Sequence, residues 1–325
     1  MIWLSLRQQR AETLLTAVML LLLAALFVPA GLHLASFYTQ DNVAHCLHDA
    51  RLGKSLACAQ TLSDFGGRAG VLRSVMPWLT LLPGMIGVAL AAPLVLDLES
   101  GTYRLGWTQS VTRARWLGAR FGTAIVAALA AGGLLALLFT WYREPLDKVF
   151  GRFDGSSGFD LEGIVPVSYV LFALGLALAI GVTWRRTAPA VITSFLAYIG
   201  TRVFVDTWLR QRYVSPLSVT WSVNATAPAP RSLNYAWTLY SGLSDRAGHP
   251  FSGGYAALQA CGRVAYNGSK VLNAHCLARH GAGFNTAVYQ PVSRYWEFQG
   301  IEFALFGGLA ALLIAFAAWQ VLRAD

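Results

Sequence analysis

The sequence predicts an all-α membrane protein with six transmembrane helices, and three observations support this fold class. Of the 325 residues, 55% are hydrophobic and only 13% are charged, whereas an average soluble domain has about 25% charged residues. The mean hydropathy is +0.49. Six apolar runs are long enough to cross about 30 Å of hydrocarbon at 1.5 Å per residue. This composition excludes an ordinary soluble globule and a disordered chain.

The six apolar runs define the expected spans. They are Leu14–Leu34, Val75–Leu96, Phe121–Trp141, Val165–Trp184, Ala190–Leu209 and Ile301–Leu322. The first run is longer than the 7–15 residues of a signal-peptide core, so we expect it to remain as a span. Residues 2–12 mix Trp and Leu with Arg and Gln, which is typical of a short helix that lies in the membrane interface.

Arginines at the ends of the spans predict the orientation. The short segments on one side of the predicted map carry Arg7, Arg10, Arg104, Arg113, Arg115, Arg120, Arg185, Arg186 and Arg323. Short basic segments stay in the cytoplasm, so we expect cytoplasmic N and C termini. The net charge of +9 is then a feature of topology. No nucleic-acid partner is expected, since no basic stripe is interleaved with aromatic residues.

The expected organisation has three parts. Residues 1–209 hold spans one to five, residues 210–298 form a small extracellular insertion, and residues 299–325 hold span six and a cytoplasmic tail. The insertion carries Trp221, Tyr235, Trp237 and Tyr240 among Pro, Ser and Gly, so it is too aromatic for a plain disordered loop.

The four cysteines lie in two outer segments of this map. Cys46 and Cys58 share one segment, and Cys261 and Cys276 share the other. Local pairs on the oxidising side favour two disulfides, Cys46–Cys58 and Cys261–Cys276. Histidines beside these cysteines leave a zinc site as the alternative, but zinc needs reduced thiols. We therefore expect no metal site.

The chain lacks the signatures of an enzyme. No Gly-x-x-x-x-Gly-Lys-Ser/Thr loop is present, and the closest stretch, 262–270, has the wrong spacing. The protein is therefore not expected to hydrolyse ATP, and it has no candidate catalytic residue or cofactor. Within the spans, Arg202 and Asp206 share one helix face. They either line a substrate route or neutralise each other. No other carboxylate is expected at mid-depth, which disfavours an ion-coupled carrier.

The connector between spans two and three, Glu99–Trp116, is short, polar and rich in tryptophan. Ser110 or Thr112 is a candidate N-cap for a helix over Arg113–Arg120. Trp107 and Trp116 suit the membrane interface. Such an element can present a membrane domain to a soluble partner, although a plain basic interfacial loop is the alternative.

Several of these motifs together resemble actinobacterial permeases of the ATP-binding-cassette type-2 exporter family. The resemblance rests on segments 1–10, 99–116, 151–155, 159–163 and 185–189, and it covers about residues 1–210 and the last span. It implies six spans, an interfacial N-terminal helix, a coupling helix between spans two and three, and an extracellular insertion between spans five and six. It also implies two permease copies, identical or closely related, and two separate ATPase subunits that bind ATP and Mg.

The resemblance implies two sets of functional residues. The residues expected to couple to the ATPase are Glu99, Gly101, Thr102, Arg104, Trp107, Thr108, Gln109, Ser110, Arg113 and Trp116. The residues expected to line the substrate path are Met76, Trp78, Thr80, Leu82 and Met85 on span two and Thr193, Phe195, Tyr198, Thr201 and Arg202 on span five. Export of an amphipathic or hydrophobic drug, antibiotic, peptide or lipid is expected. The alternative is a membrane sensor that binds a ligand through the insertion.

Overall fold

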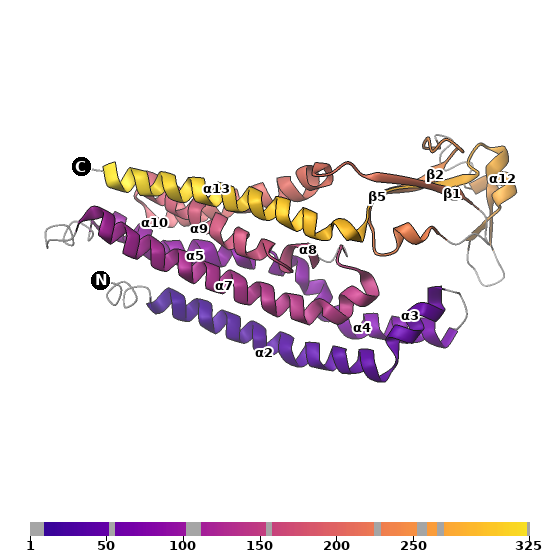
Figure 1. Ribbon diagram of the computed structural model, residues 1–325, viewed down its shortest axis with the longest axis horizontal. Coiled ribbons are helices and arrows are strands. Elements are labelled where there is room, and N and C mark those ends of the chain that lie inside the picture. The colour runs from indigo at the N-terminus through magenta and orange to yellow at the C-terminus, as the bar shows by residue number, and fades with distance from the viewer. Residues whose placement is uncertain are drawn as a thin grey trace. The chain divides into compact units, whose positions relative to one another are not determined.

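The computed structural model describes residues 10–51, 56–101, 112–153, 158–223, 229–251, 259–264 and 270–323. Its longer helices are α2 (Arg10–Gln40), α4 (Leu56–Leu79), α5 (Leu82–Ser100), α7 (Arg113–Phe150), α9 (Val165–Trp184), α10 (Thr187–Phe204) and α13 (Tyr295–Arg323) (Figure 1). Its shorter helices are α3 (Val43–Arg51), α8 (Gly158–Leu161) and α12 (Ala274–Arg279). Its strands are β1 (Leu217–Ser222), β2 (Trp237–Ser244), β3 (Gly262–Val264), β4 (Lys270–Leu272) and β5 (Phe284–Gln290).

The chain divides into two compact units, which we describe separately. The first unit comprises residues 1–150, 154–210 and 296–325, and the second comprises residues 151–153 and 211–295. The first unit is a bundle of long helices whose two chain ends lie at the same end of the bundle (Figure 1). The second unit contains the five strands.

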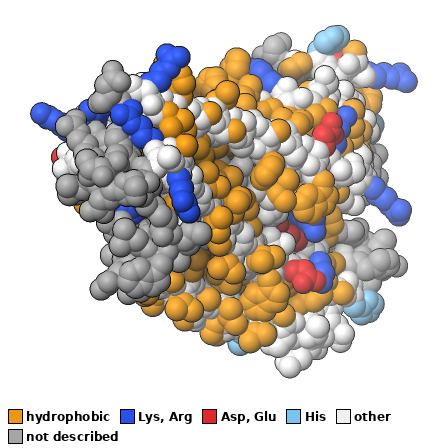
Figure 2. All heavy atoms as spheres, turned by 60° about the vertical axis from the view of Figure 1, so that its left-hand side comes forward, with side chains coloured by type: hydrophobic (Ala, Val, Ile, Leu, Met, Phe, Trp, Pro, Cys, Tyr) orange, Lys and Arg blue, Asp and Glu red, His pale blue; other side chains and the backbone are white. Residues whose placement is uncertain are grey.

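Six helices of the described residues are long and apolar enough to cross a membrane, which confirms the six-span prediction. They cover Thr13–Gln40, Leu82–Ser100, Arg113–Phe150, Val165–Trp184, Thr187–Arg212 and Val292–Arg323. The fourth span has the predicted bounds. Hydrophobic side chains cover a broad area of the face shown in Figure 2, as a surface in contact with lipid requires. The predicted interfacial helix lies mostly outside the described residues.

The predicted second span, Val75–Leu96, is wrong at its beginning. Residues up to Leu79 belong to α4, a 24-residue helix, and a turn at Thr80 and Leu81 separates it from α5. Pro83 lies in the first turn of α5, where the missing proline amide costs no hydrogen bond. Apolar composition continued across this turn, so hydropathy alone did not reveal it.

Glycines allow α5 and α9 to pack closely. A Cβ at Gly87 would lie 2.7 Å from Ala173 Cβ and 2.8 Å from Leu174 N, and it would also collide with Val170 O. A Cβ at Gly181 would overlap the Val95 side chain. Small residues at such crossings let membrane helices gain dispersion contacts from backbone to backbone.

Helices α2, α4 and α7 share a separate hydrophobic cluster. Phe27 of α2 packs edge-on against Phe139 and Tyr142 of α7, with ring centroids 5.0 and 4.9 Å apart. Phe65 and Met76 of α4 are fully buried in the same cluster. Residues 56–73, expected in the outer segment between spans one and two, therefore belong to a helix with its own core contacts.

The second unit is built on an antiparallel sheet with the strand order β1-β5-β2. Thr286 of the central strand bonds through its hydroxyl to Thr220 on one side (2.9 Å) and to Ser244 on the other (2.7 Å). Strands β3 and β4 form a separate two-stranded sheet. The all-α prediction thus holds for the membrane spans, whereas the inserted residues are rich in strands, which the sequence analysis did not specify.

Both predicted disulfides are formed. Cys46 of α3 is bonded to Cys58 of α4, and Cys261 is bonded to Cys276 of α12. The sulfur atoms of Cys261 and Cys276 lie near a ring nitrogen of His280, a grouping that could hold a metal ion if the thiols were free. Because both sulfurs are committed to the disulfide, this grouping offers one ligand.

Candidate functional site in the helical bundle

The two helices that flank the predicted coupling connector are joined by an ion pair at its base. Asp97 near the end of α5 accepts a hydrogen bond from the guanidinium of Arg120 in α7. The Arg120 side chain is 5% exposed and that of Asp97 is 20% exposed. A partly buried charged pair fixes its geometry better than an exposed one, so the connector begins and ends at two helices held together.

The connector is also joined to the start of span five. Glu99 accepts a hydrogen bond from the backbone N–H of Thr187, the first residue of α10, at 2.7 Å. The first amides of a helix have no partner within it, and the helix dipole favours a negative charge there. Glu99 therefore acts as a cap supplied by another helix, and it connects α5 to α10 directly.

The predicted helix over Arg113–Arg120 is not a separate element. These residues form the first turns of α7, which continues to Phe150. Thr112 is the N-cap, since its hydroxyl accepts from the Arg115 N–H. Trp116 is buried beside Arg120, whose guanidinium carbon lies 6.0 Å from the ring centroid. Trp116 therefore packs within the chain.

The centre of the connector lies outside the described residues. This applies to Thr102, Arg104, Trp107, Thr108, Gln109 and Ser110. Gly101 ends α5 with a positive φ of 71°, a conformation that favours glycine. Arg113 is partly buried at the start of α7.

At the other end of the bundle, charged residues from four helical segments form a buried cluster. We call Asp160, Tyr169, Arg202, Arg210 and Glu302 the arginine network. Each is at most 9% exposed. Arg202 Nη1 donates to Glu302 Oε1 at 2.9 Å and Arg202 Nη2 lies 2.9 Å from Asp160 Oδ1. Arg210 donates to Asp160 Oδ1 at 2.6 Å and to both Glu302 oxygens at 2.8 Å.

The formal charges within the arginine network cancel. Two guanidinium groups face two carboxylates, and the Tyr169 hydroxyl donates to Glu302. Burial raises the pKa of Asp160, but the charges of Arg202 and Arg210 outweigh that effect and hold the pKa at about 2. Asp160 is therefore ionised at neutral pH. A buried ion cluster is tolerated only when its members are paired and hydrogen-bonded.

A π-helical turn brings the two arginines onto one face. Residues Val205–Leu209 form the turn, and the Arg210 N–H donates to Val205 O five residues earlier. Eight residues of regular α-helix would rotate Arg210 about 80° away from Arg202. One extra residue in the turn reduces the offset to about 20° in the opposite direction. The irregular turn is thus what lets both side chains reach Glu302.

Arg202 does not have the partner that the sequence analysis considered, which was Asp206 on the same helix face. Arg202 does not neutralise Asp206, because Asp206 accepts from Arg210 at 2.5 Å with its side chain half exposed. The carboxylates that pair with Arg202 come from α8 and α13 instead. Glu302 is fully buried in the second turn of α13.

Gln299, one turn before Glu302, fixes the loop that carries Asp160. Its Oε1 accepts from the N–H groups of Ile164 and Val165 at 3.1 and 3.2 Å, and its Nε2 donates to Phe159 O at 2.8 Å. The side chain is fully buried. Two adjacent turns of α13 therefore position the start of α9 and the carboxylate of α8.

The predicted substrate-path residues do not form one surface. Met76, Tyr198 and Arg202 are buried, Trp78 and Met85 are exposed, and Thr80, Leu82, Thr193, Phe195 and Thr201 are partly buried. Leu82 packs with the cluster of α2 and α7. Met76 lies on α4, where its sulfur accepts from Arg143 at 3.4 Å. The buried side chains of Met76, Tyr198 and Arg202 therefore pack inside the bundle and do not line an open path in this conformation.

Tyr198 packs span five against the beginning of span two. Its ring fills the space left by the missing side chain of Gly84, and its hydroxyl donates to Thr80 O at 3.3 Å. Phe195 stacks on it with ring centroids 6.4 Å apart. Spans two and five are therefore neighbours, joined by this buried tyrosine and by the Glu99–Thr187 hydrogen bond.

Helix α10 presents a broad apolar face to the outside of the bundle. Its buried stripe is narrow and consists of Ala190, Ser194, Tyr198 and Arg202. Its exposed large residues are Ile192, Leu196, Val203 and Phe204. The sequence analysis selected none of these four.

Comparison with protein families identifies the class of this chain. The family model described as ABC-2 membrane transporter related matches residues 17–210. The chain belongs to this family, whose members are membrane components of ABC transporters. The protein is thus a multi-pass membrane permease component, and family membership implies ATPase subunits as partners. No curated protein and no solved structure matched the chain.

Sequence reasoning missed most of the polar contacts at the two bundle ends. Asp97 and Arg120 lie at span boundaries, where charges are common, so nothing marked them as partners. Asp160 and Glu302 belong to different predicted segments, and no spacing rule connects them to Arg202. One signal was available. Two arginines, Arg202 and Arg210, at one end of an apolar helix are rare, and charged residues in membrane spans usually have partners.

Proposed function

We propose that this protein is the permease subunit of an ATP-driven exporter, located in a bacterial plasma membrane with both termini in the cytoplasm. Two permease copies, identical or closely related, would assemble with two ATPase subunits. The substrate class is amphipathic or hydrophobic. The apolar exposed face of α10 supports this class, since a path beside it would favour apolar ligands.

The observation that carries the proposal is the double attachment of the connector. Asp97–Arg120 joins its two flanking helices, and Glu99 caps α10. A push on the connector by an ATPase would therefore act on α5, α7 and α10 together. When the ATPase closes on ATP, this push would favour one arrangement of the helices over another. ATP can shift that equilibrium because it binds the closed state of the ATPase more tightly than the open one.

The proposal is tested by reconstituting the protein with its ATPase. Trp107→Ala removes an expected contact with the ATPase, and Glu99→Ala removes the cap on α10. Loss of an aromatic anchor at an interface often costs about 2 kcal/mol or more. We expect Trp107→Ala to lower ATPase retention and Glu99→Ala to lower substrate-stimulated ATP hydrolysis and export.

Glu144→Ala is the matched control, because Glu144 is exposed on α7 and pairs with the exposed Lys148 on the same helix. Retention, ATP hydrolysis and export should stay at the parent level in this variant. Parent-level values in all three measurements for Glu99→Ala and Trp107→Ala would reject the exporter mechanism. Failure of any ATPase to co-purify with the parent would favour the sensor alternative.

A further inference from the structure

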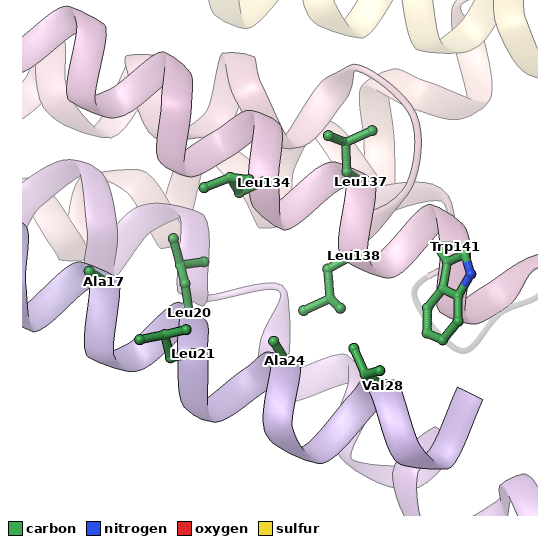
Figure 3. A pocket seen from close by; sticks show the side chains of 9 residues that line it. All are labelled: Ala17, Leu20, Leu21, Ala24, Val28, Leu134, Leu137, Leu138 and Trp141. Carbon is green, nitrogen blue, oxygen red and sulfur yellow. The ribbon is translucent and has the colours of Figure 1, made fainter. Parts of the chain in front are cut away.

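An apolar groove lies between α2 and α7 on the outside of the bundle. Its volume is about 640 Å³. The lining residues are Ala17, Leu20, Leu21, Ala24, Val28, Leu134, Leu137, Leu138 and Trp141, and Figure 3 shows where they lie on the two helices. The indole nitrogen of Trp141 is the single polar side-chain atom among them.

The groove follows from the spacing of small and large residues. On α2 the lining positions recur every three or four residues, so they form one stripe. Ala17 and Ala24 leave space in this stripe that the leucines of α7 do not fill. At one end the helices meet closely, because a Cβ on Gly31 would lie only 2.7 Å from the Trp141 ring. The groove therefore occupies the stretch of α2 that precedes this contact.

The chemistry and position of the groove indicate its occupant. Both helices are membrane spans, and Leu21, Leu134 and Leu137 are exposed at its rim. With no charged or hydroxyl group in the lining, the groove has nothing to bind a polar ligand. Hydrocarbon is the medium that such a surface meets in a bilayer.

The length of the groove suits one acyl chain. Ala17 to Val28 covers about 17 Å along α2 at 1.5 Å per residue. This length is close to the hydrocarbon depth of one leaflet, about 15 Å. We propose that the groove is a binding site for one acyl chain of a membrane lipid.

This proposal depends on membrane insertion and not on any ATPase partner. The bound chain would fill the space that Ala17 and Ala24 leave open and so complete the packing of α2 on α7. It would supply dispersion contacts that the protein side chains lack there.

Quenching of Trp141 by brominated lipid tests the site. The full chain is reconstituted into vesicles of dioleoyl phosphatidylcholine or of the same lipid brominated at mid-chain, since bromine quenches indole fluorescence on contact. The chain has 11 tryptophans, so the signal of Trp141 is taken as the difference between the parent and Trp141→Phe.

Ala24→Phe fills the groove, and Ala25→Phe is its matched control, because Ala25 is an exposed neighbour outside the lining. We expect bromine to quench Trp141 in the parent and in Ala25→Phe, and at least twofold less in Ala24→Phe. Ala17→Phe provides a second filling variant if Ala24→Phe does not insert.

Two outcomes would overturn the proposal. Absence of quenching in the parent would mean that protein covers the groove, for example a second copy of the chain. Equal quenching in the parent, Ala24→Phe, Ala17→Phe and Ala25→Phe would mean that Trp141 meets only the general bilayer and that the groove holds no chain of its own.

Discussion

Glu302 is the residue on which the arginine network depends most. Its two oxygens accept hydrogen bonds from Arg202, Arg210 and Tyr169, and it is fully buried. In a low-dielectric interior, removal of one charge leaves its partner without compensation. Neutralising Glu302 would leave two buried guanidinium groups with Asp160 as their one buried counter-ion.

We therefore expect Glu302→Gln to destabilise the protein by about 3–5 kcal/mol, the usual cost of breaking a buried ion pair. The measurement is the thermal unfolding midpoint in detergent, which should fall by several degrees. Glu297→Gln, at an exposed position of the same helix, should leave the midpoint unchanged. Equal midpoints for both variants would show that the network contributes nothing to stability.

At the scale of helices, the contact of α5 with α9 depends on glycine. Gly87 packs against the backbone of α9 so closely that even a methyl group has no room. Gly133 of α7 is the informative comparison, since an added Cβ there meets nothing within 4 Å. The two glycines both lie inside helices, and they differ in what surrounds them: the backbone of α9 at Gly87 and open space at Gly133.

We expect Gly87→Ala to destabilise the bundle by about 1–3 kcal/mol, because overpacking forces the helices apart. Gly133→Ala should instead stabilise α7 by about 0.5–1 kcal/mol through its lower conformational entropy when unfolded. Unfolding midpoints of the two variants should therefore move in opposite directions. A shift of Gly87→Ala in the same direction as Gly133→Ala would contradict the close packing of α5 and α9.

At the scale of the whole molecule, the contacts at the bundle ends make topology testable. All four cysteines are in disulfides, so a single added cysteine supplies one reactive thiol. Ser100 and Ala188 are exposed and flank the Glu99–Thr187 hydrogen bond. They must therefore lie on the same side of the membrane.

We expect Ser100→Cys and Ala188→Cys to react with a membrane-impermeant maleimide only after cells are permeabilised, because their connectors carry the arginines that stay inside. Ser222→Cys and Ser293→Cys, at exposed positions near the ends of the inserted segment, should react in intact cells. Labelling of Ser100→Cys in intact cells would invert the predicted orientation, and different results for Ser100→Cys and Ala188→Cys would contradict the contact itself.

The sequence by itself determined the membrane spans and the local pairings. Twenty consecutive apolar residues need lipid or a core to bury them, so composition along the chain was sufficient for the six helices. The disulfides and the Thr112 cap were predictable for a related reason, since their partners lie 12, 15 and 3 residues apart. Interactions over such short separations are restricted by the chain to a few geometries.

Only the tertiary structure decided which distant groups meet. Arg202 lies 100 residues from Glu302, and Glu99 lies 88 residues from Thr187. No periodicity selects one partner among many at such separations, because the choice depends on how the helices pack and on the π turn before Arg210. The break between α4 and α5 and the groove beside Trp141 have the same origin: hydropathy records how apolar a residue is, whereas packing decides which neighbour fills its space.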